Sequence, residues 1–449
     1  MPTRSSLIAS AALAAILLAA GGCRNESETT PRPATGQETI VQPSVGNLEV
    51  APESERVDLA MPRFSEPTNV TNPLFPVSRQ ESVLLLGRVD GQAFRTEVTL
   101  LPETRIVEWQ GQRVETLVSQ YVAYLDGRIH EVAYDFYAQD DAGAVWYFGE
   151  DVFNFRDGFI ADTHGTWIAG KDGPAAMIMP ADPGVGDVYR PENIPGFVFE
   201  EVTVKSVGRT LDGPLGPVEG GLLIEELHMD GSTEAKTFGP GYGEFFTAGG
   251  GDVEALALAV PTDALPGPTP PELATLENGA NDVFVAAGSG DWKAAGTAAA
   301  RMTSAWQDVR AGEVPDRLGP QLGGALEALT DGIRGRNAPA ARQAAIDVAR
   351  WSLDLQLRHR SVTEIDLARF DLWAAQLLVD AKAGDTAAAN GDFFSLDYIR
   401  DRIQQTLSEA DRARINVALE ELNGAVGDED LEAAADITRA LRQALAGMS

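Results

Sequence analysis

The stretch "QYVAYLDGRIHEVAYDFYAQ" (residues 120–139) decides the fold of the first large region of this chain. Apolar and aromatic residues alternate with polar ones on both sides of Asp126-Gly127, which is the strongest short-range signal of a β-hairpin. The same dipeptide recurs between alternating segments at Asp90-Gly91, Asp157-Gly158, Asp212-Gly213 and Asp230-Gly231. No long helical pattern interrupts residues 73–260. We therefore predict an antiparallel all-β domain there, closed as a curved sheet, a half-barrel or a barrel.

A proline-rich linker, predicted over residues 261–271, separates this region from an Ala-rich one at 272–449. The second region repeats itself, because "ELATLENGANDVFVAAGSGDW" (272–292) aligns without a gap on "DLARFDLWAAQLLVDAKAGDT" (366–386). In each unit Gly is followed by Asp or Asn, as expected where Gly ends one helix and the next side chain caps another. We predict an all-α domain of two repeated four-helix units. The internal repeat covers residues 272–358 and 366–446.

The helical units have two possible arrangements. Four helical hairpins can stack as a solenoid or pair into separate four-helix bundles. We favour bundles, because the similarity between the two long units is clearer than the similarity between successive hairpins.

The net charge of the chain limits the kinds of partner that it can bind. The chain has 449 residues, of which 44% are hydrophobic, and its formal net charge is −32. Its length predicts two or three domains. A negative field of this size repels phosphate backbones and anionic lipid alike, so we predict no nucleic-acid partner and no purely electrostatic membrane binding.

The N-terminal segment "LIASAALAAILLAAGGCRN" (residues 7–25) contains the only cysteine, Cys23. Its apolar run is shorter than the roughly 20 residues of a membrane-spanning helix and fits the apolar region of a secretory signal. The ending Ala20-Gly21-Gly22-Cys23 resembles the lipobox of bacterial lipoproteins, although Leu is usual where Ala20 stands. The alternative is a conventional signal peptide with an incidental Cys.

The lipobox resemblance implies the processing and the location of the protein. It implies a signal peptide at 1–22, a lipid on Cys23 and attachment to a bilayer of the bacterial cell envelope, facing outside the cytoplasm. Residues 23–72 are rich in Glu, Pro, Thr and Ser, so we predict a disordered tether there.

Two segments of the β region carry a second resemblance. "AQDDAGAVWYFGED" (138–151) and "FGPGYGEFF" (238–246) resemble pieces of exported bacterial β domains of undefined function. The resemblance implies an exported location and indicates no activity.

Catalytic motifs are missing from the sequence. There is no G-x-S-x-G, no Walker loop, no G-x-G-x-x-G and no H-E-x-x-H, and only four His are present. In "HEVAYD" (130–135), Glu131 and Asp135 point away from His130 in a strand, and we expect them to be solvent-exposed. We predict that the protein is not an enzyme and has no cofactor.

Two acids interrupt the apolar stripes of the helical repeat. Glu277 and Asp371 occupy matched positions on the first helix of each unit. A carboxylate buried there must be paired, hydrogen-bonded or metal-bound. Pairing with Arg or a helix start is the favoured interpretation, and a metal site is the alternative.

Aromatic residues crowd one part of the β region, among them Trp146, Tyr147 and Trp167. They fit either a plain core, which we favour, or the lining of an apolar ligand site on the concave face of the sheet.

The predicted function combines these features. We expect a membrane-anchored, exported lipoprotein that acts as a non-enzymatic binding or scaffolding module. Its partner is a protein or a small apolar ligand, which the β domain would hold. The alternative is a metal-binding or metal-sensing lipoprotein that uses the carboxylates of the helical domain.

Overall fold

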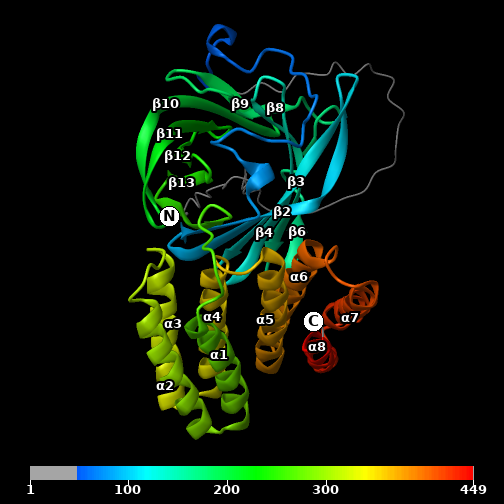
Figure 1. Cartoon of the computed structure of the whole chain (residues 1–449). Coiled ribbons are helices and arrows are strands. Elements are labelled where there is room, and N and C mark those ends of the chain that lie inside the picture. The colour runs from blue at the N-terminus through cyan, green and yellow to red at the C-terminus, as the bar shows by residue number, and fades with distance from the viewer. Residues whose placement is uncertain (1–47, 448–449) are drawn as a thin grey trace, which may run out of the picture.

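A computed structural model describes residues 48–447, in which strands come first and helices follow (Figure 1). Two short 3₁₀ helices, η1 (Glu53–Glu55) and η2 (Val77–Arg79), precede the sheet. The strands are β1 (Ser82–Val89), β2 (Gln92–Trp109), β3 (Gln112–Leu125), β4 (Arg128–Gln139), β5 (Val145–Arg156), β6 (Phe159–Asp162), β7 (Trp167–Ile168), β8 (Ala176–Met179), β9 (Val188–Ile194), β10 (Val198–Gly213), β11 (Gly216–His228), β12 (Thr233–Gly239), β13 (Gly243–Gly249) and β14 (Asp252–Val260). The helices are α1 (Pro271–Ser289), α2 (Trp292–Val309), α3 (Leu318–Arg334), α4 (Ala338–Gln356), α5 (Val362–Ala383), α6 (Thr386–Ile403), α7 (Glu409–Gly427) and α8 (Leu431–Leu445).

The strands form one 14-stranded sheet, ordered β6-β5-β4-β3-β2-β1-β14-β13-β12-β11-β10-β9, with β7 and β8 paired to β5. The paired strands run antiparallel throughout. The sheet curls over itself until β8 lies against β9, yet it does not close (Figure 1). The predicted antiparallel all-β domain is confirmed, in its curved-sheet form.

Four of the five Asp-Gly dipeptides lie in hairpin turns, whereas Asp212-Gly213 ends β10 and the turn to β11 lies at residues 214–215. Asp90-Gly91, Asp126-Gly127 and Asp157-Gly158 have positive φ at both residues, 50–53° at Asp and 75–78° at Gly. This is the type I′ conformation, whose twist matches that of the strands it joins. Gln110-Gly111, between β2 and β3, adopts the same conformation with φ of 51° and 75°.

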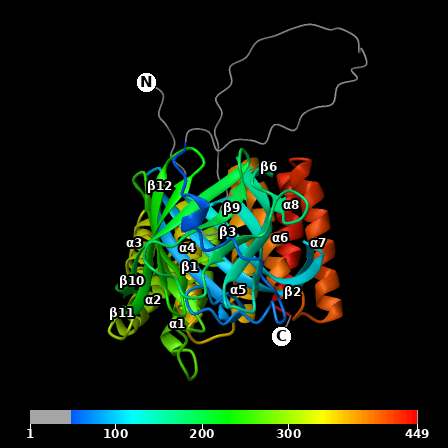
Figure 2. The same ribbon diagram turned by 90° about the horizontal axis from the view of Figure 1, so that it is seen from above.

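The helices form the two predicted four-helix units. Helix α1 contacts both α2 and α4, and α5 contacts both α6 and α8, so each unit closes on itself, while α4 and α5 join the units. Figure 2 places α1–α3 on one side and α6–α8 on the other. Gly290 and Gly384 end α1 and α5 with φ of 77° and 75°. The Asp291 and Asp385 side chains cap the next helices, as the repeat predicted. Separate bundles are therefore confirmed over a solenoid.

The tether prediction is wrong for residues 48–72. This segment packs on the β domain. Val70 is fully buried there, and the backbone of Arg56 forms an isolated parallel β-bridge with Val188 of β9. The Asn72 Nδ2 atom donates to the Pro180 carbonyl at 2.9 Å. This polar segment is ordered because its few apolar side chains, such as Val70, are buried against the β domain. The predicted signal peptide, Cys23 and the rest of the tether lie outside the described residues.

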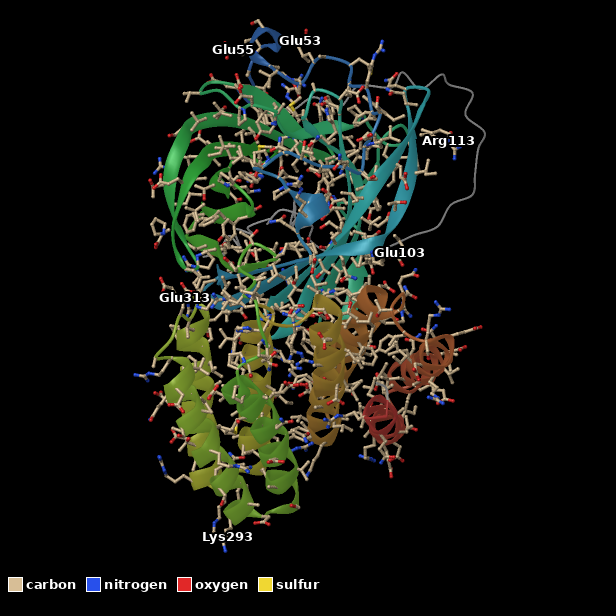
Figure 3. The ribbon with its side chains drawn as sticks, in the orientation of Figure 1. Glu53, Glu55, Glu103, Arg113, Lys293 and Glu313 are labelled. Atoms are coloured by element: carbon tan, nitrogen blue, oxygen red, sulfur yellow. The ribbon has the colours of Figure 1, made fainter. Side chains whose placement is uncertain are left out.

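The linker joins β14 to α1, since β14 ends at Val260 and α1 begins at Pro271. It is held against the helical domain, because the Leu265 amide donates to the Arg358 carbonyl at 2.6 Å. The Arg358 guanidinium in turn donates to the Asp263 carbonyl at 3.1 Å and pairs with Glu313 at 3.1 Å. Glu313 is labelled in Figure 3, where the first helices meet the sheet.

A buried charge network joins the sheet to the helices. Its three arginines and three acids lie on β2, α4, α5 and α6, and we call them the interface network: Arg95, Glu97, Asp354, Asp366, Arg369 and Arg402. Arg95 contacts Asp354 and Glu97 at 2.7 Å each, and Arg402 contacts Glu97 at 2.9 Å. Arg369 contacts Asp354 at 2.8 Å and Asp366 at 3.0 Å. Equal numbers of opposite charges allow the network to be buried.

Candidate functional site

The predicted aromatic face belongs to the core of the β domain. Trp146, Tyr147 and Trp167 are at most 3% exposed. The rings of Tyr147 and Trp167 lie edge to face with centroids 5.4 Å apart, and their polar atoms donate to acids, Tyr147 to Asp135 at 2.7 Å and Trp167 to Glu192 at 3.2 Å. These three side chains therefore fill the interior, as the plain-core interpretation expected.

The space inside the curved sheet is nearly full. Two cavities found among the described residues there measure about 20 and 50 Å³. Ligand sites for small molecules measure about 300–1,000 Å³. These two cavities are therefore too small for a ligand of that size. Figure 3 shows the side chains crowded into the concave side of the sheet.

Acidic side chains occupy part of this interior. We call the following residues of β9–β14 the interior polar cluster: Glu192, Glu200, Glu226, His228, Glu234, Lys236, Glu244 and Glu254. All are at most 9% exposed. His228 Nδ1 lies 3.0 Å from Glu200 Oε1, and His228 Nε2 lies 3.6 Å from Glu234 Oε2. The Lys236 ammonium contacts Glu226. The cluster thus contains six carboxyl groups and only two basic side chains, one lysine and one histidine.

Burial sets the charge states in the cluster. Burial and the neighbouring Glu226 raise the pKa of Glu200 to about 7, although its hydrogen bond to His228 opposes them. Burial and Glu244 raise the pKa of Glu254 to about 8. Burial alone would raise the pKa of Glu226 as well, but the Lys236 charge holds it below its usual range. Part of the cluster therefore keeps its protons near neutral pH, because burial disfavours charged carboxylates and the carboxyls also outnumber the cations.

No sequence motif indicates this cluster, although the strand pattern carries a signal for it. In "LLIEELH" (222–228) the positions 222, 224, 226 and 228 share one face of a strand, and the first two are Leu and Ile. Glu226 and His228 therefore lie on an apolar, inward face. Position in a strand pattern, and not a metal motif, would have indicated them.

The expectation for "HEVAYD" is also wrong. Glu131 and Asp135 are 6% and 2% exposed, so they are not solvent-exposed strand residues. Burial raises the pKa of each to about 8, with the charge of Asp135 adding to the effect on Glu131. They face the concave side because the whole sheet curls around it.

The two predicted helix acids lie on one groove, which we call the interunit groove. It measures about 570 Å³ and is lined by α1, α4, α5 and α8, between the two helical units. Asp371 forms two contacts of 2.8 Å with Arg442. Glu277 accepts from Gln356 at 3.0 Å and lies 3.4 Å from Arg360. The structure brings both acids to the rim and pairs each with Arg, as the favoured interpretation expected.

A second, larger cleft lies between the sheet and the N-terminal end of α6. It measures about 740 Å³, and His130, His164 and the buried Asp392 are among its lining residues. Arg128 crosses toward α5 and pairs with Asp380 at 2.6 Å. The charged residues that line the cleft are five aspartates and two arginines: Asp90, Asp157, Asp162, Asp385, Asp392, Arg128 and Arg156.

Comparisons with known proteins do not assign the chain to a family. Neither a scan of protein-family models nor a search of curated proteins gave a match. Within residues 48–447, no helix is long and apolar enough to cross a membrane.

Proposed function

We propose that this protein is an exported, lipid-anchored binding protein without catalytic activity, and that its ligand occupies the interunit groove. The observation that carries the proposal is the groove's construction. Its volume of about 570 Å³ lies within the range of small-molecule sites. Its floor is apolar, and its rim carries the two acid–arginine pairs. The floor residues include Ala280, Phe284, Ala345, Ile346, Ala349, Leu353, Leu367, Ala368, Leu372 and Ala375.

The groove fits a small ligand with an apolar body and a polar end. Burial of apolar ligand surface on the floor supplies the driving force. Glu277, Arg360, Asp371 and Arg442 supply hydrogen-bonding groups of both signs at the rim. The ligand expected for the β domain is thus proposed for the helical domain instead. A metal on Glu277 and Asp371 is not favoured, because neither carboxylate belongs to a group of three donor side chains among residues 48–447.

Filling the groove tests the proposal. Ala368 lies on α5 in the groove and is half-buried, so Ala368→Trp should occupy the floor with little effect on the fold. Native mass spectrometry of protein purified from its own host should show a bound small molecule in the wild type and none in this variant. Ala413→Trp, on the exposed surface of α7, is the matched control and should keep the ligand. A wild type without ligand, or equal retention in both variants, contradicts the proposal.

The membrane anchor is tested separately. Since the proposed anchor is the lipid on Cys23, Cys23→Ser should release the protein in soluble form or stall removal of residues 1–22. Membrane fractionation with a mass measurement distinguishes the two. A variant that stays membrane-bound at wild-type mass contradicts the anchor and leaves the groove proposal standing.

A further inference from the structure

Three side chains of the interior polar cluster converge from two neighbouring strands. Glu200 of β10 and His228 of β11 are direct partners across the antiparallel ladder. Glu226 precedes His228 by two residues, so it shares the same inward face. One donor atom from each of the three lies within 4.8 Å of the others. Strand register therefore brings one imidazole nitrogen and two carboxylates together.

These donors are not fully used by the protein. The Glu200 Oε2 atom is buried and has no hydrogen-bond partner, and Glu200 itself is 0% exposed. On the far side of the ring, His228 Nε2 faces Glu234 Oε2 at 3.6 Å, so Nδ1 is the nitrogen that lies beside Glu200. A buried carboxylate oxygen without a partner is costly, and an ion or proton supplied from outside would relieve that cost.

The surroundings resemble the support that metal ligands need. A His ligand binds through one ring nitrogen and commonly donates the other N–H to a carboxylate, which fixes the ring. His228 has Glu200 beside Nδ1 and Glu234 on the Nε2 side. Lys236 holds Glu226 in place, and its charge is balanced by the nearby Glu244 and Glu234. The excess of carboxyls would partly offset the charge of a divalent cation.

We propose that Glu200, Glu226 and His228 bind a divalent first-row transition metal ion, for which Zn²⁺ is the best match. Zn²⁺ accepts both imidazole nitrogen and carboxylate oxygen as ligands, whereas Mg²⁺ and Ca²⁺ prefer oxygen donors alone. Glu234 acts as a positioning residue through the His228 ring. This site is separate from the interunit groove, and the proposal does not rest on the groove having a ligand.

The ion has a short route to the site. His228 is the last residue of β11 and is followed by the turn at 229–232. It is 9% exposed, whereas Glu200 is fully buried behind it. The histidine edge of the site therefore lies nearest to solvent.

Calorimetric titration of the chelator-treated, full-length protein with Zn²⁺ tests the proposal. Millimolar Mg²⁺ is kept present to occupy exposed acids, because the chain carries a net charge of −32. We expect one site per chain that is tighter than about 100 μM. His228→Asn and Glu200→Gln should each weaken it by at least about tenfold. Glu225→Gln is the control, since Glu225 lies on the exposed face of the same strand and should leave the affinity unchanged.

A second readout covers variants that fail to fold. Glu234→Gln keeps all three proposed ligands and should weaken Zn²⁺ binding by about 10–100-fold, as expected for a residue that orients a ligand. With Co²⁺ as the probe, its visible absorption should change between wild type and Glu234→Gln. The proposal is overturned if folded wild-type protein has no such site in the titration, or if the Glu234→Gln and Glu225→Gln variants bind Zn²⁺ alike.

Discussion

Replacing Arg369 by methionine should lower the free energy of unfolding by about 3–5 kcal/mol, because it removes one partner from a buried ion-pair network. Arg369 is 2% exposed and contacts Asp354 at 2.8 Å and Asp366 at 3.0 Å. It also lies 3.7 Å from Glu97, whose pKa it helps to hold well below the usual range against the effect of burial. The substitution leaves these carboxylates buried with too little positive charge.

Urea unfolding followed by circular dichroism and by tryptophan fluorescence measures this loss. Arg334→Met is the matched control, because the Arg334–Asp331 pair is exposed, with side chains at 74% and 71%. An exposed pair contributes about 0–1 kcal/mol, so the control should unfold close to the wild type. A loss below about 1 kcal/mol for Arg369→Met would show that the network does not hold the sheet against the helices.

The double variant Arg369→Met/Asp366→Leu tests how much of the lost stability comes from leaving the Asp366 carboxylate buried without its partner. Removing both charges takes away the uncompensated Asp366, so part of the stability lost in Arg369→Met should return. If the double variant is as unstable as the sum of the two single variants, the charges act independently and the network interpretation is wrong.

Stability should fall as the pH rises from 6 to 8, with an expected loss of at least about 3 kcal/mol. Burial raises the pKa of Glu131 and Asp135 to about 8. Burial also raises the pKa of Glu254 to about 8. The folded state therefore retains protons that the unfolded chain releases above its ordinary carboxyl pKa. Their contribution is complete below that ordinary pKa and is lost as the pH rises toward 8.

The interface network gives the opposite dependence at acid pH. Glu97 and Asp354 have lowered pKa values, since their arginine partners outweigh the effect of burial. The stability they contribute is lost only as the pH falls below the ordinary carboxyl range. The two sets together place maximum stability in the mildly acidic range. Urea midpoints measured from pH 4 to pH 9 should trace that maximum.

One substitution tests the cause of the stability loss at alkaline pH. Glu131→Gln removes a buried carboxyl that must ionise at high pH, so the variant should be at least about 1 kcal/mol more stable than the wild type at pH 8.5. Glu108→Gln, at a side chain that is 81% exposed, should follow the wild-type curve. Parallel curves for wild type and Glu131→Gln would contradict the assigned cause.

Local signals accounted for most of the fold. The Asp-Gly dipeptides predicted the hairpins because those turns need positive φ at both residues, and Asp126-Gly127 adopts it. The helical repeat predicted where α1 and α5 end, because Gly290 and Gly384 take the left-handed conformation there. Gln110-Gly111 makes the same turn without the expected Asp, so composition alone missed it.

The candidate sites depended on contacts between distant segments. Glu277 and Asp371 were found from the repeat, but their arginine partners lie 83 and 71 residues away along the chain. Glu131 was expected to be exposed and is buried, because alternation gives two faces and does not say which face a curled sheet encloses. Glu226 and His228 were missed because no motif marks them, although they share a strand face with Leu222 and Ile224.

The sequence by itself determined the order of the domains, the antiparallel hairpins, the two helical units and their caps, since each depends on neighbouring residues and on backbone conformation. It also carried the prediction of a lipid on Cys23, which lies outside the described residues. The tertiary structure decided which acids are buried, which arginines pair with them, that residues 48–72 pack on the β domain, and where the grooves lie. Those features depend on how the sheet curls and how the units meet, and no local pattern encodes either.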